Sequence, residues 1–314
     1  MRILQRPELA PLTTLGLGGR ALAEIRLDAP DDCERLSETL SRTGGFVRVL
    51  GGGSNLLVHD GDLPFVVLRP LFGAADADGH AQDPVIVGEE DGTEGPRVLI
   101  RAGPGMRVPH LLSWCARHDL AGLEGLVGVP GRLGGAVAMN AGAYGCSTAP
   151  LLRSLDVFTP EKGLHTLSPE GWQAGYRHFS LASPCAWYMS VSAVLSLRRA
   201  APGSVRTVMK ENLLNKKSGQ PVHEHTAGCV FRNPEGRSAG RLLDQAGMKG
   251  RRRGAMFFSP MHANFLVHDV RCGIPGSAAD ALSLIEEAKR AVRERFGVEL
   301  VMEVKEWDHG PDER

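Results

Sequence analysis

The sequence predicts an α+β protein, because strand-like and helix-like segments occur in separate runs along the chain. Apolar alternation predicts strands, for example over 21–27 and 263–267, and helical spacing with a start signal predicts a helix over 277–297. Two glycine-rich segments, 51–55 and 121–145, interrupt this pattern. The 314 residues are enough for two or three domains.

Composition excludes several classes of protein. Apolar residues make up 42% and charged residues 23%, as in globular domains. Lys plus Arg and Asp plus Glu both total 36, so the net charge of zero argues against nucleic acid or an anionic membrane as the main partner. No apolar run is long enough for a membrane span, and the N-terminus lacks a signal-peptide pattern. Six scattered cysteines predict reduced thiols in a cytoplasmic protein.

The first elements surround a glycine turn. A glycine-rich turn near 13–20 precedes the strand 21–27, and Pro30 opens a helix that ends at about Ser41. A buried strand over 46–50 leads into Gly51-Gly52-Gly53-Ser54-Asn55, after which 56–58 resumes a strand. Such a turn directs backbone N–H groups at an anion such as a pyrophosphate. The alternative is a plain tight turn, and the motif is neither a Rossmann fingerprint nor a Walker A loop.

The next segments bring the chain to its second glycine-rich stretch. Residues 73–96, rich in Asp, Glu, Gly and Ala, predict a solvated hairpin or loop. The strand 98–103 and a helix over 108–118 follow, with Cys115 on the apolar face of that helix, where we expect it in the core.

The stretch 121–145 has glycine at every third position from Gly122 to Gly134 and again at 135, 142 and 145. Glycine loses more backbone freedom on folding than any other residue, so ordering this stretch is costly. Its apolar residues exclude a flexible linker, which would be polar and serine-rich. We favour close approach of a bound ligand to the backbone over a purely structural glycine bend.

The C-terminal half predicts further strands and helices. Strands are expected over 155–159 and 187–197, with the segment GYRHFS between them, and a helix over 204–217 after a boundary near 200–205. A helix over 239–246 comes before the basic run 251–253.

The last elements are marked by clear signals. Alternation returns at Ala263, Phe265 and Val267. Ser277 with Asp280 is a helix-start signature for a helix that ends at Gly297, and the last strand is expected over 298–307.

Six motifs follow one another over nearly the whole chain: GGGSNLLV, LVGVPGRLGGAVAMNAGAYG, GYR, AGCVFRNP, AGMKG and a terminal EVK strand. Their order and spacing resemble the UDP-N-acetylenolpyruvoylglucosamine reductase family, the UDP-N-acetylmuramate dehydrogenases. The resemblance implies an FAD-binding domain of the p-cresol methylhydroxylase type made of two α+β subdomains, 1–70 and 71–203. A C-terminal α+β substrate domain, 204–314, would follow.

The resemblance also implies the reaction and its partners. NADPH would reduce FAD, and the reduced flavin would reduce the enolpyruvyl group of UDP-N-acetylglucosamine enolpyruvate. The product, UDP-N-acetylmuramate, is a precursor of peptidoglycan and hence of the cell wall. We expect non-covalent FAD, because no motif indicates attachment through His or Cys, and a monomer without a metal ion.

Site residues are carried over by position. The matching catalytic residues are Arg177, Cys229 as the proton donor that is usually serine in this family, and Glu303. Lys217 and Asn233 would bind the diphosphate of the sugar nucleotide. The residues matched to FAD binding are Gly51, Gly52, Gly53, Ser54, Asn55, Gly128, Gly131, Gly134, Gly135, Ala136, Asn140 and Gly142.

The residue types suit these roles. A guanidinium such as that of Arg177 holds a carboxylate with two parallel bonds and stabilises developing negative charge. A thiol, with an ordinary pKa near ~8.5, is a much better acid than a serine hydroxyl, although it is sensitive to oxidation. Considered alone, the three residues would be a surface arginine, a core cysteine and a solvated edge-strand glutamate.

Two departures from the family pattern stand out. Thr13 stands where the family often has asparagine. The spacing from Arg177 to Cys229 is too short for the tyrosine-bearing substrate loop of the longer class, so the chain resembles the shorter class.

Other interpretations of the motifs are open. His223, Glu224 and His225 together with Cys229 invite a zinc site but lack recognisable ligand spacing. The run 251–253 could contact a phosphate or form a solvated face. For function, the alternatives are an FAD oxidase or dehydrogenase of the same fold acting on another small alcohol or sugar, and a glycine-rich scaffold without catalysis.

Overall fold

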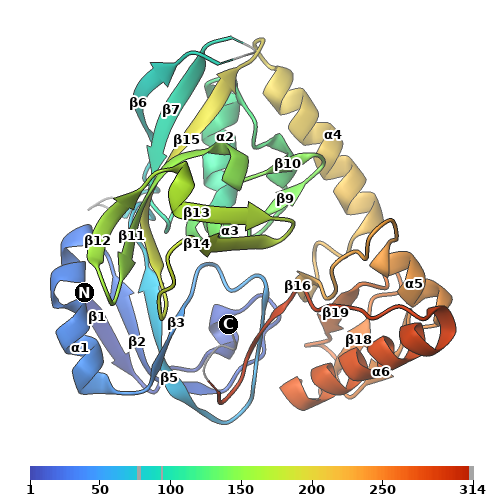
Figure 1. Cartoon of the computed structure of the whole chain (residues 1–314). Helices are drawn as coiled ribbons and strands as arrows, with labels where there is room; N and C mark the ends of the chain where they lie inside the picture. The colour runs from blue at the N-terminus through green and yellow to red at the C-terminus, as the bar shows by residue number, and fades with distance from the viewer. Residues whose placement is uncertain (76–78, 93–94, 311–314) are drawn as a thin grey trace. The chain divides into compact units, whose positions relative to one another are not determined.

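The computed structural model describes residues 1–75, 79–92 and 95–310 (Figure 1). Its backbone packs into two compact units, each built from separate stretches of the chain. Unit 1 comprises Met1–Leu4, Ala23–Gly52 and Val66–Asn215. Unit 2 comprises Gln5–Leu22, Gly53–Phe65 and Lys216–Arg314.

An antiparallel sheet forms the centre of unit 1, with its strands in the order β12-β11-β15-β7-β6 and β8 beside β15. The strands are β6 (Val85–Glu90), β7 (Arg97–Ala102), β8 (Leu120–Ala121), β11 (Leu152–Thr159), β12 (Gly163–Leu167) and β15 (Met189–Arg199). The predicted strands are confirmed, except that β15 begins at Met189 and not at Trp187. The expected hairpin in 73–96 is formed by β6, paired with β7; residues 76–78 and 93–94 lie outside the described part of the chain.

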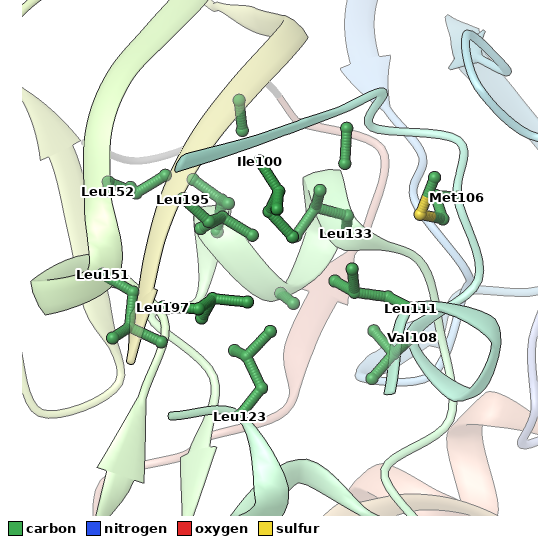
Figure 2. Close-up of a cluster of buried hydrophobic side chains, with 14 of the residues drawn as sticks. Ile100, Met106, Val108, Leu111, Leu123, Leu133, Leu151, Leu152, Leu195 and Leu197 are labelled. Atoms are coloured by element: carbon green, nitrogen blue, oxygen red, sulfur yellow. The ribbon is translucent and has the colours of Figure 1, made fainter. Parts of the chain in front are cut away.

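Helices α2 (Val108–Arg117) and α3 (Leu133–Ala138) pack on this sheet. Figure 2 shows the resulting core, in which leucine and isoleucine side chains from α2, α3, β7 and β15 point toward one another. Cys115 is buried in this core, as predicted. Leu123 and Leu133, from the glycine-rich stretch, are buried here too, so the stretch is anchored by its own apolar residues.

A second sheet has the strand order β1-β2-β5-β3. Its strands are β1 (Arg2–Gln5), β2 (Arg20–Leu27), β3 (Phe46–Val49) and β5 (Asp62–Pro70). β5 was not predicted, although Phe65, Val66, Val67 and Leu68 are fully buried. The helix expected from Pro30 is a 3-10 turn, Pro30–Arg35, followed by α1 (Leu36–Thr43). Helix α4 (Ser204–Gly219) also matches its prediction.

Unit 2 contains the sheet β16-β19-β18-β17, on which α6 (Ala278–Phe296) buries Leu284, Ile285 and Val292. The start signature of α6 is confirmed, because the Ser277 side chain accepts a hydrogen bond from the Asp280 N–H at 3.1 Å, and Gly297 ends the helix at φ 63°. The remaining elements are β4 (Leu56–Val58), β16 (His225–Cys229), α5 (Ala239–Gln245), β17 (Arg252–Arg253), β18 (Met256–Phe258), β19 (Phe265–His268) and β20 (Lys305–Trp307).

The final predicted strand, 298–307, is wrong in length. Only Lys305–Trp307 forms a strand, pairing in parallel with β4, and Met302 makes an isolated bridge to Phe231. The N–H groups of Glu303 and Val304 both donate to the Val230 carbonyl. This doubled pairing interrupts the regular ladder, which is why an apolar alternation did not become one continuous strand.

Unit 1 also buries a charged group. The Glu24 carboxylate, 1% exposed, accepts bonds from Arg26 at 2.7 Å and from Arg69 at 2.6 Å. Burial by itself would raise the pKa of Glu24, but the hydrogen bonds from Arg26 and Arg69 outweigh it and lower that pKa below its ordinary value. Glu24 therefore stabilises the fold above the carboxyl pKa of the unfolded chain, and this contribution is lost as the pH falls through the lower folded value.

We predict that Glu24→Gln lowers the free energy of unfolding at neutral pH by about 1–3 kcal/mol, since two partly buried guanidinium groups lose their counter-charge. The loss shrinks toward pH of about 3.5, below the ordinary carboxyl pKa of about 4.3, because the unfolded wild-type chain there takes up a proton that the folded carboxylate resists. Urea unfolding at both pH values measures it, with exposed Glu38→Gln as the control. An equal loss at both pH values would contradict the assignment.

Candidate functional site

Two glycine segments of unit 1 meet backbone to backbone. A Cβ atom on Gly51 would lie 3.1 Å from the Gly135 Cα atom. One on Gly52 would overlap the Gly131 Cα atom and lie 3.0 Å from the Arg132 nitrogen. No side chain fits between these segments, so the glycines are required by packing as well as by any ligand.

Protein contacts explain other glycines of the 121–145 stretch. A Cβ atom on Gly134 would meet Pro104, and one on Gly125 would overlap the Ala143 carbonyl oxygen. Gly128 and Gly131 have φ values of 72° and 120°, which side chains rarely tolerate. Packing and backbone conformation therefore require glycine at these positions, which supports a structural glycine bend. Close approach of a bound ligand to the same backbone remains a prediction.

Positive charge gathers beside the glycine contact. Arg132 donates to the Gly105 carbonyl, and its pKa is lowered by burial and by the nearby charges of Arg69 and Arg107. Although Arg69 pairs with Glu24, its Nε atom is buried without a partner among the described residues. Guanidinium groups that repel one another are stabilised by a bound anion. The residues present thus fit the diphosphate of a dinucleotide such as FAD.

Arg177 lies at the tip of a hairpin in unit 1. β13 (Trp172–Gly175) pairs with β14 (His178–Leu181), and the last pair, Gly175 with His178, leaves a two-residue turn of Tyr176 and Arg177. Arg177 has a φ of 54°, which is unfavourable for a residue with a long side chain. Its guanidinium lies 5.0 Å from the centre of the Tyr176 ring, a cation–π distance. Such strained positions cluster at functional sites.

The chain enters this region through α3 and a second small hairpin. β9 (Gly142–Ala143) and β10 (Cys146–Ser147) are joined by Tyr144 and Gly145, whose φ values are 48° and 79°. Just before β9, Asn140 is 8% exposed, and its side chain donates to the Gly175 carbonyl at 2.8 Å. A residue matched to FAD binding thus contacts the hairpin that carries Arg177.

Cys229 is half-buried at the end of β16 in unit 2. It follows Gly228, whose φ of 81° suits glycine, and the pairing of β16 with β19 shifts register between Thr226 and Cys229. A register shift of this kind re-aims the side chain that follows it. The direction of the Cys229 thiol therefore differs from the one that regular alternation along β16 would give it.

Glu303 lies on the neighbouring segment of unit 2. Its N–H donates to the Val230 carbonyl at 2.7 Å, one residue after Cys229. Asn55 holds this segment from the other side: its Nδ2 donates to the Glu303 carbonyl at 3.1 Å, and its own carbonyl accepts from the Lys305 N–H at 3.0 Å. The structure thus brings Asn55 and the segments carrying Cys229 and Glu303 together, whereas Arg177 belongs to unit 1.

Two cations near Glu303 were not predicted as site residues. Lys305 has a pKa lowered by burial and by the charge of Arg232. The Arg232 N–H donates to the Val301 carbonyl at 2.9 Å, so the two residues lie on the paired segments 229–232 and 301–305. Both lay within recognised motifs, FRNP and EVK, which was the only signal available. Together they give this part of unit 2 an affinity for anions.

The residues matched to the substrate diphosphate differ in their settings. The Asn233 side-chain oxygen accepts from the Ala239 N–H at 3.0 Å, which ties the amide to the first turn of α5. Lys217 is exposed near the end of α4, while its neighbour Lys216 is only 5% exposed.

A histidine next to α5 was also missed by the sequence. The His262 Nδ1 atom accepts a hydrogen bond from the Asn264 N–H at 3.2 Å, and burial, with the charge of Lys249, lowers the pKa of His262. The neutral ring therefore carries its proton on Nε2. A Cβ atom on Gly240 would lie 2.8 Å from this ring. A lone histidine has no spacing pattern, so only the fold identifies it.

Thr13, the position of the first departure, organises its own turn. Its hydroxyl donates to the Leu17 carbonyl at 3.0 Å and accepts from the Gly16 N–H at 3.1 Å. The side chain therefore closes the first glycine turn in the way a short polar residue does.

The basic run belongs to surface ion pairs. Arg251 pairs with Glu287 at 2.6 Å, and Arg252 pairs with Asp269 at 3.0 Å. Over the described ranges, no three His, Cys, Asp or Glu side chains are arranged to hold a metal ion. A helix long and apolar enough to cross a membrane is likewise lacking in the described part of the chain.

Comparisons with known proteins identify the family to which the chain is similar. Residues 21–168 match the family described as FAD binding domain, and residues 220–307 match the UDP-N-acetylenolpyruvoylglucosamine reductase C-terminal domain. A curated UDP-N-acetylenolpyruvoylglucosamine reductase from Nitratidesulfovibrio vulgaris is 46% identical over 97% of this chain and 98% of its own length. The protein of the same name from Oleidesulfovibrio alaskensis is also 46% identical, with the same coverage.

Among solved structures, the UDP-N-acetylenolpyruvylglucosamine reductase from Thermus caldophilus superimposes with a TM-score of 0.77 at 33% identity. The match covers 98% of this chain and 100% of that one.

We predict that Gly52→Ala weakens FAD binding and destabilises unit 1 by about 1–3 kcal/mol, because the new methyl group would overlap Gly131 in a packed backbone contact. Flavin absorbance per protein after gel filtration and thermal unfolding of the flavin-free protein measure the two effects. Gly219→Ala is the matched control, since a Cβ atom there meets nothing within 4 Å. Full flavin retention in Gly52→Ala would show that this contact is dispensable for the cofactor.

Proposed function

This chain belongs to the UDP-N-acetylenolpyruvoylglucosamine reductase family, and we propose that Arg177, Cys229 and Glu303 carry out the family's reduction in it. The protein is an FAD-containing, NADPH-dependent oxidoreductase. It reduces the enolpyruvyl group of UDP-N-acetylglucosamine enolpyruvate to give UDP-N-acetylmuramate for peptidoglycan synthesis. One observation supports the residue assignment: the segments of Cys229 and Glu303 lie side by side through the bond from the Glu303 N–H to the Val230 carbonyl, and each departs from regular strand pairing at this point.

When bound, FAD supplies a hydride acceptor for NADPH and a hydride donor for the enolpyruvyl double bond. The residues proposed to hold it come from two glycine segments, together with the adjacent arginine cluster. They are Gly51, Gly52, Gly53, Ser54, Asn55, Gly128, Gly131, Gly134, Gly135, Ala136, Asn140 and Gly142. We keep the division into FAD subdomains 1–70 and 71–203 and substrate domain 204–314 as part of the proposal, although the two packing units cut across it.

Arg177 is proposed to bind the substrate carboxylate. Reduction of the enolpyruvyl group places negative charge on the carbon next to the carboxylate and delocalises it into that group. Two parallel N–H bonds from a guanidinium hold the carboxylate and stabilise this charge. The two-residue turn supports the role, because it places the guanidinium at the tip of a hairpin.

Cys229 is proposed to protonate the carbon that carries the developing charge. The proton leaves Sγ, a C–H bond forms, and a thiolate remains, which solvent then reprotonates. A thiol is acidic enough to give up this proton near neutral pH.

Glu303 is proposed to orient the carboxylate end of the substrate. Its segment is fixed on both sides, by the Val230 carbonyl and by the Asn55 amide, so the side chain starts from a defined backbone. Lys217 and Asn233 are proposed to bind the diphosphate of the sugar nucleotide.

The proposal includes the setting of the enzyme. We propose a cytoplasmic monomer that acts without nucleic acid or a membrane as a partner. Its six cysteines are thiols, as expected in a reducing compartment. The alternative of an FAD oxidase or dehydrogenase is not favoured, because the match to known reductases extends through residues 220–307.

We predict that Cys229→Ala leaves reduction of the bound flavin by NADPH unchanged and slows its reoxidation by the enolpyruvyl substrate by about 100-fold or more, the usual contribution of a general acid. Stopped-flow absorbance of the flavin separates the two half-reactions. Cys229→Ser is the matched variant and should retain most of the second half-reaction, since a hydroxyl also donates a proton. If the alanine variant reoxidised at the wild-type rate, another group would be the proton donor.

A further inference from the structure

The side chain of Asn140 links the glycine-rich stretch to the hairpin of Arg177. We propose that Asn140 is a positioning residue for Arg177, an inference that rests on the role proposed for that arginine. Its Nδ2 donates to the Gly175 carbonyl at 2.8 Å. Gly175 is the last residue of β13 and immediately precedes the two-residue turn.

Asn140 itself is fixed within unit 1. Its N–H donates to the Val137 carbonyl at 2.9 Å, and its φ of 40° is a conformation that asparagine tolerates better than most residues. Its side-chain oxygen accepts from the Ala149 N–H at 2.9 Å. Since a backbone N–H only donates and a carbonyl only accepts, these two bonds fix which end of the amide faces which segment.

The hairpin needs such an anchor near its turn. β13 and β14 form a sheet of only two strands, and an isolated pair of this kind is marginally stable. Phe179, one pair away from the turn, is 7% exposed and stacks on Trp172 with ring centres 6.0 Å apart. The turn end carries Arg177 in an unfavourable conformation. The bond from Asn140 to the Gly175 carbonyl ties this end to the segment that directly follows α3.

The anchor also relates the guanidinium to the proposed cofactor segment. Asn140 directly follows α3, which contains Gly134, Gly135 and Ala136. A shift of the turn would therefore change the place of Arg177 relative to residues proposed to hold FAD. Misplacement of a binding group by about 1 Å costs a rate factor on the order of 100.

Two variants test the inference. Asn140→Gly removes both side-chain bonds but accepts the backbone conformation, and Asn140→Asp keeps the acceptor for Ala149 while placing a carboxylate against the Gly175 carbonyl. In both, reoxidation of reduced flavin by the enolpyruvyl substrate should slow by about 10- to 100-fold. Because Asn140 is also among the residues proposed to hold FAD, both half-reactions are measured on flavin-saturated protein, and reoxidation by the substrate should slow more than flavin reduction by NADPH does. Equal slowing of both half-reactions with loss of flavin would overturn the inference.

A matched control exists in the same unit. Asp119 has a φ of 52°, and its side chain accepts from the Gly203 N–H at 2.8 Å. Asp119→Gly therefore removes the same kind of side-chain bond at the same kind of backbone position. It should lower the melting temperature as Asn140→Gly does, with both half-reactions unchanged. If it slowed substrate-dependent reoxidation as much, the effect would be general and the inference would fail.

A double-mutant cycle tests the connection to Arg177. Because Asn140 is proposed to act through that guanidinium, Asn140→Gly should cause no further slowing in an Arg177→Ala background. Multiplied losses would mean that Asn140 acts independently of Arg177 and would overturn the inference.

A readout without catalysis completes the test. Hydrogen exchange of the backbone amides in 172–181 should become faster in Asn140→Gly, because the turn end loses its tie to α3. Unchanged exchange would overturn the inference whatever the enzyme's reaction is. If the enolpyruvyl substrate failed to reoxidise the reduced flavin of the wild-type protein, the proposed function would be wrong. The exchange result would still decide whether Asn140 holds the turn that carries Arg177.

Discussion

Close contact between two backbones is the constraint on which unit 1 depends. A Cβ atom on Gly52 would overlap the Gly131 Cα atom, so position 52 accepts no side chain. This contact sets the path of the chain from Gly131 into α3, and the Leu133 N–H then bonds to the Met106 carbonyl at 2.9 Å. Leu133 enters the core shown in Figure 2. The arginines that would attract an anion lie next to this contact because Arg132 follows Gly131 directly.

Unit 2 contains two of the residues that we propose to act on the substrate, Cys229 at the end of β16 and Glu303 in the segment before β20. Regular strands alternate their side chains between the two faces, which fixes where each points. The register shift before Cys229 and the doubled bonding at the Val230 carbonyl interrupt this alternation next to Cys229 and Glu303. Irregular pairing is therefore the feature by which we expect unit 2 to direct these side chains, while α6 packs on the sheet and contributes to its core.

Local patterns in the sequence predicted most elements, and long-range contacts explain what they missed. Helices α2, α4 and α6 followed from apolar spacing and caps, which depend on neighbours within a turn. The last strand was predicted too long, because the bonds to Val230 come from a segment about 70 residues away. Motif order identified the candidate residues, but the contacts of Asn55 and Asn140 with Glu303 and Gly175 depend on folding. The tautomer of His262 likewise had no signal in its surroundings along the chain.

The φ of 54° at Arg177 has a consequence for how this chain responds to selection or engineering for stability. Glycine adopts that conformation without steric cost, so a search for stabilising substitutions would favour Arg177→Gly. The same replacement removes the guanidinium that we assign to the substrate. At this turn, a substitution that raises stability therefore lowers turnover. Selection for a higher melting temperature without an activity screen should accumulate substitutions at position 177.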